Sequence, residues 1–345
     1  PSKALIAVAE AATDVRGAKI LGVHTSDVTV DLEEVNARLK KWASSQSRDI
    51  QQRLASEGIR IINGRGRLVG ASTVEAELSD GSTEVLQADA ILLATGARPR
   101  QLDDAKPDGE RILNWTQLYD LAELPTKLIV VGSGVTGAEF AGAYQSLGSQ
   151  VVLVSSRTQV LPGEDSDAAQ VIETVFAKRG MQVLAQSRAQ QVVRTDDGVE
   201  VTLASGEVIT GSHCLMAVGS IPNTANIGLE AVGVAMNEAG FIEVDKVSRT
   251  NIRGVYAAGD CTGVMMLASV AAQQGRIAMR HALGDSVIPL HLENVSSNIF
   301  TDPEIATVGV SQHDVDSGEV DANTVMLPLA TNARAKMQGI SDGFI

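Results

Sequence analysis

The sequence is poor in cysteine, in long apolar runs and in positive charge. Its 345 residues include two cysteines, Cys214 and Cys261, too few for a disulfide-stapled secreted domain. No apolar run approaches the ~20 residues that span a bilayer, and no signal peptide opens the chain. The 28 Lys and Arg against 42 Asp and Glu give a net charge of −14, which phosphate backbones would repel. We therefore expect a soluble cytoplasmic protein that neither spans a membrane nor binds nucleic acid.

What the chain does contain suits a globular α/β protein of about two or three domains. Hydrophobic residues make up 44% and charged residues 20%, which is enough for a sizeable core. Both ends look cut, because the chain starts at Pro1 without an initiator Met and stops in the apolar run 343–345. Chain ends are normally exposed and polar. We therefore expect a fragment of a longer protein.

Two stretches of the chain, residues 58–99 and 180–222, follow the same order of patterns. Each predicts a strand after a helix, a hairpin closed by a glycine turn, and an apolar strand that ends at Gly96 or Gly219. The two glycines are 123 positions apart, and other equivalent residues keep nearly the same offset. A duplicated domain explains this agreement. A chance resemblance between two ordinary hairpins is the alternative.

The second copy begins with a pattern typical of dinucleotide binding. A buried strand at 127–131 leads into Gly-Ser-Gly-Val-Thr-Gly at 132–137, then a helix at 138–147 and a strand at 151–154. A strand, a Gly-x-Gly-x-x-Gly turn, a helix and a strand within about 30 residues form the βαβ unit that binds dinucleotides. The first copy has no such unit, so we expect its counterpart upstream of Pro1.

The three glycines of this turn have separate expected roles. A pyrophosphate needs backbone N–H groups at close range and the positive end of a helix dipole. Gly132 would permit the tight turn, Gly134 would leave room for the phosphates, and Gly137 would let the helix pack on the strand.

The residues that follow the second strand, Ser155, Ser156 and Arg157, bear on the choice of coenzyme. NAD sites place Asp or Glu there to accept from the ribose 2′-hydroxyl, whereas a 2′-phosphate needs donors and positive charge. No carboxylate follows until Glu164. The pattern favours NADPH, or the use of both coenzymes. A solvated loop charge is the alternative for Arg157.

Several motifs together resemble the pyridine nucleotide-disulfide oxidoreductase family. Residues 250–260, Thr-Asn-Ile-Arg-Gly-Val-Tyr-Ala-Ala-Gly-Asp, resemble its second FAD-binding motif, and Ala-Thr-Gly at 94–96 accompanies it. Residues 300–309 resemble the start of its dimerisation domain. Pro-Ser-Lys at 1–3 resembles the residues directly after its redox cysteine pair.

Within the family, residues 132–140 and 331–337 look like lipoamide-dehydrogenase-like proteins of a branch that acts as NAD(P)H:quinone reductase and lacks a working disulfide pair. The resemblance implies an α/β fold with duplicated, three-layer Rossmann-like domains for FAD and NAD(P), plus the start of an α+β dimerisation domain. It also implies a homodimer for the full-length protein. The implied parts begin with an FAD-binding domain without its first βαβ unit, at 1–124, and an NAD(P)-binding domain, at 125–246. The chain then returns to the FAD-binding domain at 247–293 and ends in a truncated dimerisation domain at 294–345.

The resemblance implies two catalytic residues. Lys3 would approach flavin N5 and pair with Glu139 on the helix after the glycine turn. A cation near N5 favours electron-rich reduced flavin, and a buried Lys needs a carboxylate partner. The alternatives are a frayed terminal charge for Lys3 and a helix-surface position for Glu139.

Five further residues would contact or support FAD. Gly66 would lie against the adenine, and Thr95 and Gly96 would support the site from the crossover into the next domain. Asp260 would accept a hydrogen bond from the ribityl chain, or else cap a turn. Ala268 would begin a helix whose N-terminus faces the flavin pyrimidine and stabilises negative charge there.

The leading interpretation is an FAD-dependent oxidoreductase, in which hydride passes from NAD(P)H, bound near Gly219, to flavin and electrons pass to a small-molecule acceptor. The resemblance favours a quinone. A dihydrolipoamide dehydrogenase or other disulfide reductase, with a cysteine pair upstream of Pro1, is the alternative. A third interpretation is a non-catalytic nucleotide-binding fragment that holds FAD poorly. No metal site is expected, because no metal-ligand spacing occurs among the histidines, which are His24, His213, His281, His291 and His313.

Overall fold

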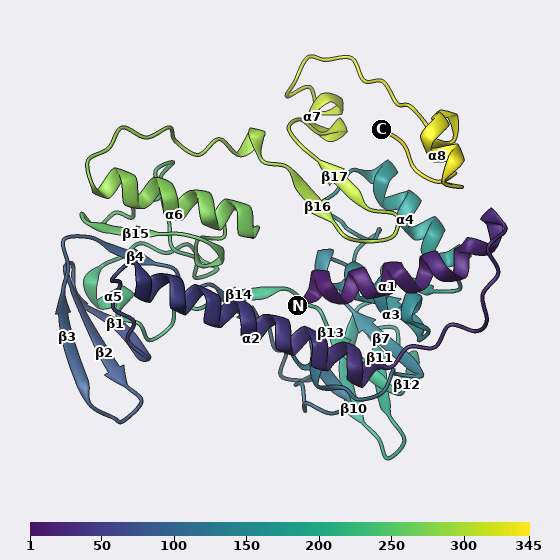
Figure 1. The fold of residues 1–345 in the computed structure, drawn as a ribbon, viewed down its shortest axis with the longest axis horizontal. Coiled ribbons are helices and arrows are strands. Elements are labelled where there is room, and N and C mark those ends of the chain that lie inside the picture. Colours follow the sequence, from purple (N-terminus) through teal and green to yellow (C-terminus); the bar gives the residue numbers. More distant parts are fainter. The chain divides into compact units, whose positions relative to one another are not determined.

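The computed structural model describes the whole chain, residues 1–345, as two compact units. Unit 1 comprises residues 1–47, 99–219 and 298–345, and unit 2 comprises residues 48–98 and 220–297. Helix α2 (Leu32–Ser56) begins in unit 1 and ends in unit 2. Figure 1 labels the helices and strands of both units.

A five-stranded parallel sheet organises unit 1, in the strand order β6-β13-β7-β8-β9. Both faces of this sheet are covered, as is typical of parallel sheets, and this accounts for the nearly continuous apolar sequences of β7 and β8. The strands are β6 (Ile112–Asn114), β13 (His213–Met216), β7 (Lys127–Val131), β8 (Gln150–Val154) and β9 (Gln182–Leu184).

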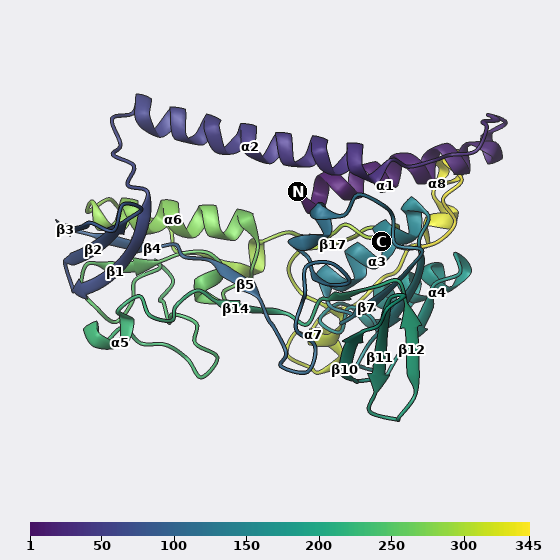
Figure 2. The same ribbon diagram turned by 90° about the horizontal axis from the view of Figure 1, so that it is seen from below.

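Helices cover one face of the sheet and a small antiparallel sheet covers the other (Figure 2). Side chains alternate between the two faces of a strand. Leu128 and Val130 of β7 therefore pack against the helices, while Ile129 and Val131 pack against the antiparallel sheet. The covering elements are the helices α1 (Ser2–Gly17), α3 (Val135–Leu147) and α4 (Ser166–Lys178), and the strands β10 (Ala189–Arg194), β11 (Val199–Leu203) and β12 (Val208–Gly211).

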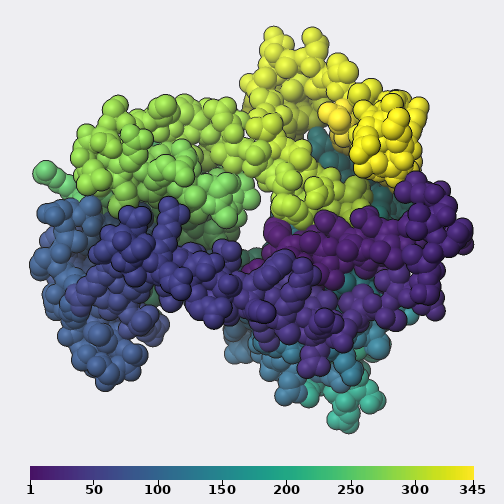
Figure 3. Space-filling view, viewed as in Figure 1, coloured from purple at the N-terminus to yellow at the C-terminus, as the bar shows by residue number.

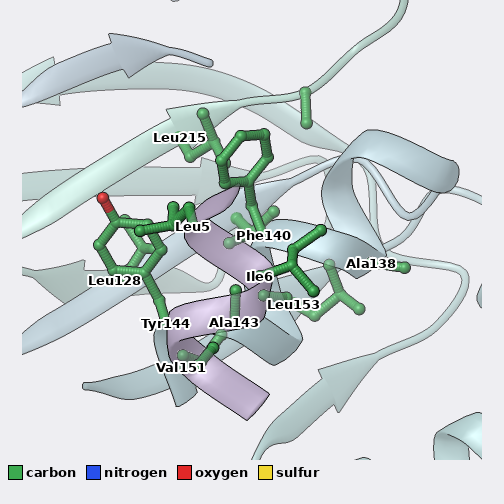
Figure 4. Packing of buried hydrophobic residues seen from close by; sticks show 14 of the residues in the cluster. Leu5, Ile6, Leu128, Ala138, Phe140, Ala143, Tyr144, Val151, Leu153 and Leu215 are labelled. Atoms are coloured by element: carbon green, nitrogen blue, oxygen red, sulfur yellow. The ribbon is translucent and has the colours of Figure 1, made fainter. Parts of the chain in front are cut away.

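Helix α1 packs directly on α3. Small residues of α3, such as Ala138 and Ala143, leave room for Leu5 and Ile6 of α1, and all four are buried (Figure 4). This packing holds the first turn of α1, and with it Lys3, against α3.

Unit 2 repeats part of this plan. An antiparallel sheet β1-β2-β3 precedes β4, which pairs in parallel with β15, and α6 packs on those two strands (Figure 1). Leu68, Leu93 and Val255 belong to its buried cluster. The elements are β1 (Gly64–Gly70), β2 (Thr73–Leu78), β3 (Thr83–Gln87), β4 (Ile91–Leu93), β14 (Ser220–Pro222), α5 (Leu229–Val232), β15 (Val255–Ala257), η3 (Asp260–Thr262) and α6 (Ala268–Ala282). Strand β5 (Ala97–Pro99) begins in unit 2, and its last residue belongs to unit 1.

Equivalent positions of the two sequence copies make equivalent hydrogen bonds. The amide of Asn223 donates to the carbonyl oxygen of Gly96 at 2.9 Å, and the amide of Arg100 donates to that of Gly219 at 2.9 Å. The two donors, like the two acceptors, are 123 positions apart. Each bond lies within one unit. In both copies a three-stranded antiparallel sheet precedes a parallel strand, so the duplication predicted from the sequence is present in the topology.

Three local expectations differ from the structure. Residues 59–62 form no strand, although the equivalent residues of the second copy form β9. The reason is that β9 pairs with β8, and no strand of this chain is placed to pair with 59–62 in the same way. Strands β1 and β10 extend each expected hairpin to three strands. Helix α6, expected over 268–283, ends at Ala282.

Residues 298–345 add short elements to unit 1. The hairpin of β16 (Ser297–Ile299) and β17 (Ile305–Thr307) buries Ile299 and Ile305 in the core on the helical face of the sheet. The final residues, yellow in Figure 3, lie on the surface, where Gly339 lies against Ile20. No helix of the chain is both long enough and apolar enough to cross a bilayer. The remaining short elements are η1 (Ala18–Leu21), η2 (Gln117–Asp120), η4 (Leu292–Asn294), α7 (Gln312–Asp316), η5 (Leu329–Thr331) and α8 (Ala333–Met337).

Candidate functional site

The glycine turn joins β7 to α3, and its three glycines have different surroundings. Gly132 has φ +110°, and a Cβ there would lie 2.2 Å from the carbonyl oxygen of Ala217. A Cβ on Gly137 would lie 1.8 Å from the carbonyl oxygen of Gly132. A Cβ on Gly134 would meet nothing within 4 Å. Gly132 and Gly137 are therefore required by the fold, whereas Gly134 borders open space.

The N-terminus of α3 is left without a side-chain cap. Gly134 is its N-cap residue, no side chain accepts from the first N–H groups, and the first turn contains no acidic residue. The free N–H groups and the positive end of the helix dipole together favour an anion such as a pyrophosphate.

The loop after β8 contains Ser155, Ser156 and Arg157, and hydrogen bonds of Ser155 hold it in place. The hydroxyl of Ser155 is fully buried, shares a hydrogen bond of 2.7 Å with the hydroxyl of Ser133, and accepts from the amide of Arg157 at 3.1 Å. The amide of Ser187 donates to the carbonyl oxygen of Ser155 at 2.7 Å. Ser156 and Arg157 are exposed. Ser155 thus shapes the loop, while its two neighbours offer donors to the outside.

Lys3 and Glu139 form an ion pair between the first turn of α1 and the second turn of α3. The Glu139 side chain is 5% exposed and the Lys3 side chain 51%. Glu139 Oε1 also accepts from the amide of Phe300 at 3.0 Å, and Lys3 Nζ lies 4.2 Å from the centre of the Phe300 ring. The buried carboxylate therefore has two donors, and the pair expected from the family resemblance is present in the structure.

Sequence reasoning missed Phe300 and Tyr119 as neighbours of this pair. Burial, and to a smaller degree the charge of Glu139, raise the pKa of Tyr119, so its phenol stays protonated. The Tyr119 ring meets that of Phe140 edge-on, with the ring centres 6.4 Å apart. Phe300 is 161 positions from Glu139, and no local pattern marks it as a neighbour.

The expected FAD residues lie in unit 2, two of them at one edge of its parallel strand pair. Strands β4 and β15 run side by side, so Thr95 and Asp260, which follow them, lie at the same carboxyl edge. The side-chain amide of Asn223 donates to the carbonyl oxygen of Thr95 at 3.0 Å, and Gly96 has φ +67°. The turn at Thr95 and Gly96 is thereby fixed.

Two further expected residues of unit 2 have contrasting settings. Helix α6 begins at Ala268 and, like α3, has no side-chain cap and no acidic residue in its first turn. Its N–H groups are available to negative charge. Gly66 is an exposed residue of β1 opposite Ala76. Gly219 belongs to unit 1, where it follows β13 with φ +95°.

The chain matches one known protein family over nearly its whole length. A family model described as pyridine nucleotide-disulphide oxidoreductase matches residues 1–275, and a model for the dimerisation domain of the same family matches residues 295–345. The chain belongs to the pyridine nucleotide-disulphide oxidoreductase family. Members of this family bind FAD and NAD(P)H.

Individual members of this oxidoreductase family are similar over the whole chain. A NAD(P)H dehydrogenase (quinone) of Mycobacterium tuberculosis is 52% identical over 353 aligned positions, which cover 100% of this chain and 72% of that protein. A dihydrolipoyl dehydrogenase of Zymomonas mobilis is 33% identical over 350 positions, covering 100% and 75%. The crystal structure of LpdA from Mycobacterium tuberculosis matches with a TM-score of 0.94 at 52% identity, covering 100% and 75%. The protein is an oxidoreductase, and the predicted α/β fold with Rossmann-like sheets and part of a dimerisation domain is confirmed.

The two cysteines of this family member are both buried and free. Burial raises the pKa of the Cys214 thiol, which keeps it protonated and poorly reactive. Cys261 contacts the carbonyl oxygens of Leu93 and Ala258, at 3.5 and 3.3 Å. Both are therefore core residues of the described chain.

Proposed function

We propose that the protein transfers hydride from NAD(P)H, with NADPH preferred, to FAD, and that a quinone accepts the electrons. The observation that carries this proposal is the placement of Glu139. The carboxylate that holds Lys3 stands on α3, one turn beyond the uncapped glycine turn that would bind the coenzyme pyrophosphate. The coenzyme-binding turn and the carboxylate of the candidate redox pair thus share one helix.

The residues of the chain fit a nicotinamide coenzyme on unit 1. The uncapped N–H groups of α3 would hold its pyrophosphate, and the open space beside Gly134 would admit it. Ser156 and Arg157 would donate to a 2′-phosphate, with Ser155 fixing the loop beneath them. Gly219 would border the coenzyme at the end of β13.

The residues of unit 2 fit part of an FAD site. Bound FAD would supply the hydride-accepting and electron-donating chemistry that side chains lack. The uncapped N-terminus of α6 at Ala268 would stabilise negative charge, and Asp260 would accept from a hydroxyl. Thr95 and Gly96 would shape the same edge, and Gly66 would lie against the adenine.

Lys3 would place its positive charge beside the flavin, and Glu139 would hold that charge in place. A fixed cation favours the electron-rich reduced state of a neighbouring group because it stabilises negative charge. Glu139 is buried and already has two donors, so its role is to orient Lys3.

The preference for a quinone over a disulfide rests on similarity. The relative named NAD(P)H dehydrogenase (quinone) is 52% identical, whereas the dihydrolipoyl dehydrogenase of Zymomonas mobilis is 33% identical. A role like that of the second relative is the alternative. The domain limits 1–124, 125–246, 247–293 and 294–345, a homodimer joined through residues 294–345, and a cytoplasmic location complete the proposal.

Anaerobic reduction tests this function. The full-length protein, loaded with FAD, is mixed with NADPH and the visible absorption band of the flavin is followed, then a benzoquinone or lipoamide is added. We expect the band to bleach with NADPH and to return with the quinone but not with lipoamide. Return with lipoamide alone would favour the disulfide reductase. A band that never bleaches would leave only a nucleotide-binding role.

A further inference from the structure

The turn between β16 and β17 is anchored firmly to unit 1. Ile299 and Ile305 on either side of it are buried in the core beside α1 and α3. Arg179, at the end of α4, donates to the carbonyl oxygen of Asp302 at 3.0 Å and pairs with its carboxylate at 2.7 Å. Thr301 is buried, and its hydroxyl donates to the carbonyl oxygen of Pro303 at 2.7 Å. Phe300 therefore stands on a fixed backbone.

Phe300 contacts both members of the Lys3–Glu139 pair through different groups. Its backbone N–H donates to Glu139 Oε1 at 3.0 Å. Its ring lies under the Lys3 ammonium, with Nζ 4.2 Å from the ring centre. An aromatic face attracts a cation at this distance. One residue thus holds the carboxylate by its main chain and the ammonium by its side chain.

The contacts of Phe300 with Glu139 and with Lys3 have different roles, because the carboxylate is buried and the ammonium is half exposed. Glu139 is buried and cannot turn to water, so the amide of Phe300 supplies a donor that its carboxylate requires. Lys3 is half exposed, on a long and flexible side chain. Glu139 alone fixes one direction of the ammonium, and the ring, 4.2 Å from Nζ, adds a second attraction from another direction.

We propose that Phe300 is a positioning residue that holds the Lys3–Glu139 pair in one geometry, and that through this pair it tunes the flavin. The second part rests on the proposed function, since it requires Lys3 to face the flavin. The first part concerns only the residues of this chain. A residue of the dimerisation domain thereby supports the candidate redox site.

The first experiment measures the position of Lys3 without using activity. Lysines are reductively dimethylated with ¹³C-formaldehyde and a borane reductant, which preserves their charge, and the Lys3 signal is identified by its loss in Lys3→Arg. We expect this signal to be displaced upfield by the Phe300 ring. Phe300→Leu should remove the displacement and Phe300→Tyr should keep it. An undisplaced signal in the unsubstituted protein, or one unaffected by Phe300→Leu, would overturn the proposal.

The second experiment measures the midpoint potential of the bound flavin and the rate of its reduction by NADPH. Phe300→Leu should lower the potential in the same direction as Lys3→Met but by less, and should slow reduction about two- to fivefold. Phe300→Tyr should restore both. If the Phe300→Leu protein does not fold, Phe300→Met provides a second variant of similar volume.

The two outcomes separate this proposal from the proposed function. A Lys3→Met effect on the potential without any Phe300→Leu effect would overturn the tuning role of Phe300. If neither variant changes the potential while the NMR displacement depends on Phe300, positioning stands and the flavin role of Lys3 fails.

Discussion

The hydroxyl groups of Ser133 and Ser155 share a hydrogen bond of 2.7 Å, and both side chains are buried. Ser133 lies inside the glycine turn and Ser155 ends the β8 segment, so this bond ties together the two loops that would hold the pyrophosphate and the ribose. Many NAD sites have a carboxylate where this chain has Ser155. Here that position stabilises the loop, and Arg157 is left as the charge that faces outward.

Arg157→Ala should therefore change coenzyme preference. Charge-assisted hydrogen bonds to a phosphate contribute about 1.5–3 kcal/mol, so the KM for NADPH should rise about tenfold or more. The KM for NADH should change little, because NADH has no 2′-phosphate. Steady-state kinetics with both coenzymes measures this. Arg253→Ala, which removes an exposed guanidinium from unit 2, is the control. Equal effects of Arg157→Ala on the KM values of both coenzymes would mean that Arg157 does not contact the 2′-phosphate.

Gly137→Ala and Gly134→Ala should separate folding from binding. The Cβ at position 137 would overlap backbone at 1.8 Å, so the free energy of unfolding should drop by at least about 2 kcal/mol. The Cβ at position 134 meets open space, so stability should change by less than about 1 kcal/mol. Gly134→Ala should instead weaken NADPH binding. Urea unfolding and calorimetric titration measure the two quantities, and a stable Gly137→Ala protein would contradict the packing described here.

Lys3→Met should destabilise the protein more than Glu139→Gln. Removing Lys3 leaves a carboxylate that is 5% exposed without its counter-charge, whereas removing the charge of Glu139 leaves an ammonium that is 51% exposed and can be hydrated. We expect losses of about 2 and about 1 kcal/mol in urea unfolding at neutral pH. The double variant should recover part of the larger loss. Equal losses would indicate that burial does not govern the pair.

Acid should destabilise the protein through His213. Burial, and less strongly the charge of Arg111, lower the pKa of His213 from 6.5 to about 4. Between these pH values the unfolded imidazole binds a proton that the folded one refuses, so stability falls as pH falls. The contribution should reach about 1–2 kcal/mol, below the full shift because the ring is partly exposed.

Urea unfolding across this pH range measures that contribution. His213→Gln should flatten the dependence, while His24→Gln, at an exposed residue, should leave it unchanged. If the His213 variant keeps the full slope, other groups cause the acid sensitivity.

Patterns confined to one stretch of chain predicted the structure well. The βαβ unit around Gly134 and the helix that starts at Ala268 are found at the expected positions, because turn chemistry and periodicity are local. Strand β1 could not be read this way, since its three glycines disfavour a strand. It forms because it pairs in register with β2. Phe300 was missed for a similar reason, as only tertiary packing brings it to Glu139.

Helix α3 is continuous from its N-terminus at the glycine turn to Glu139. Glu139 follows the N-cap Gly134 by five residues, which is about 8 Å along the axis. Under the proposed function, the site of the coenzyme pyrophosphate and the carboxylate that orients Lys3 therefore keep a fixed spacing, set by one short segment of α3.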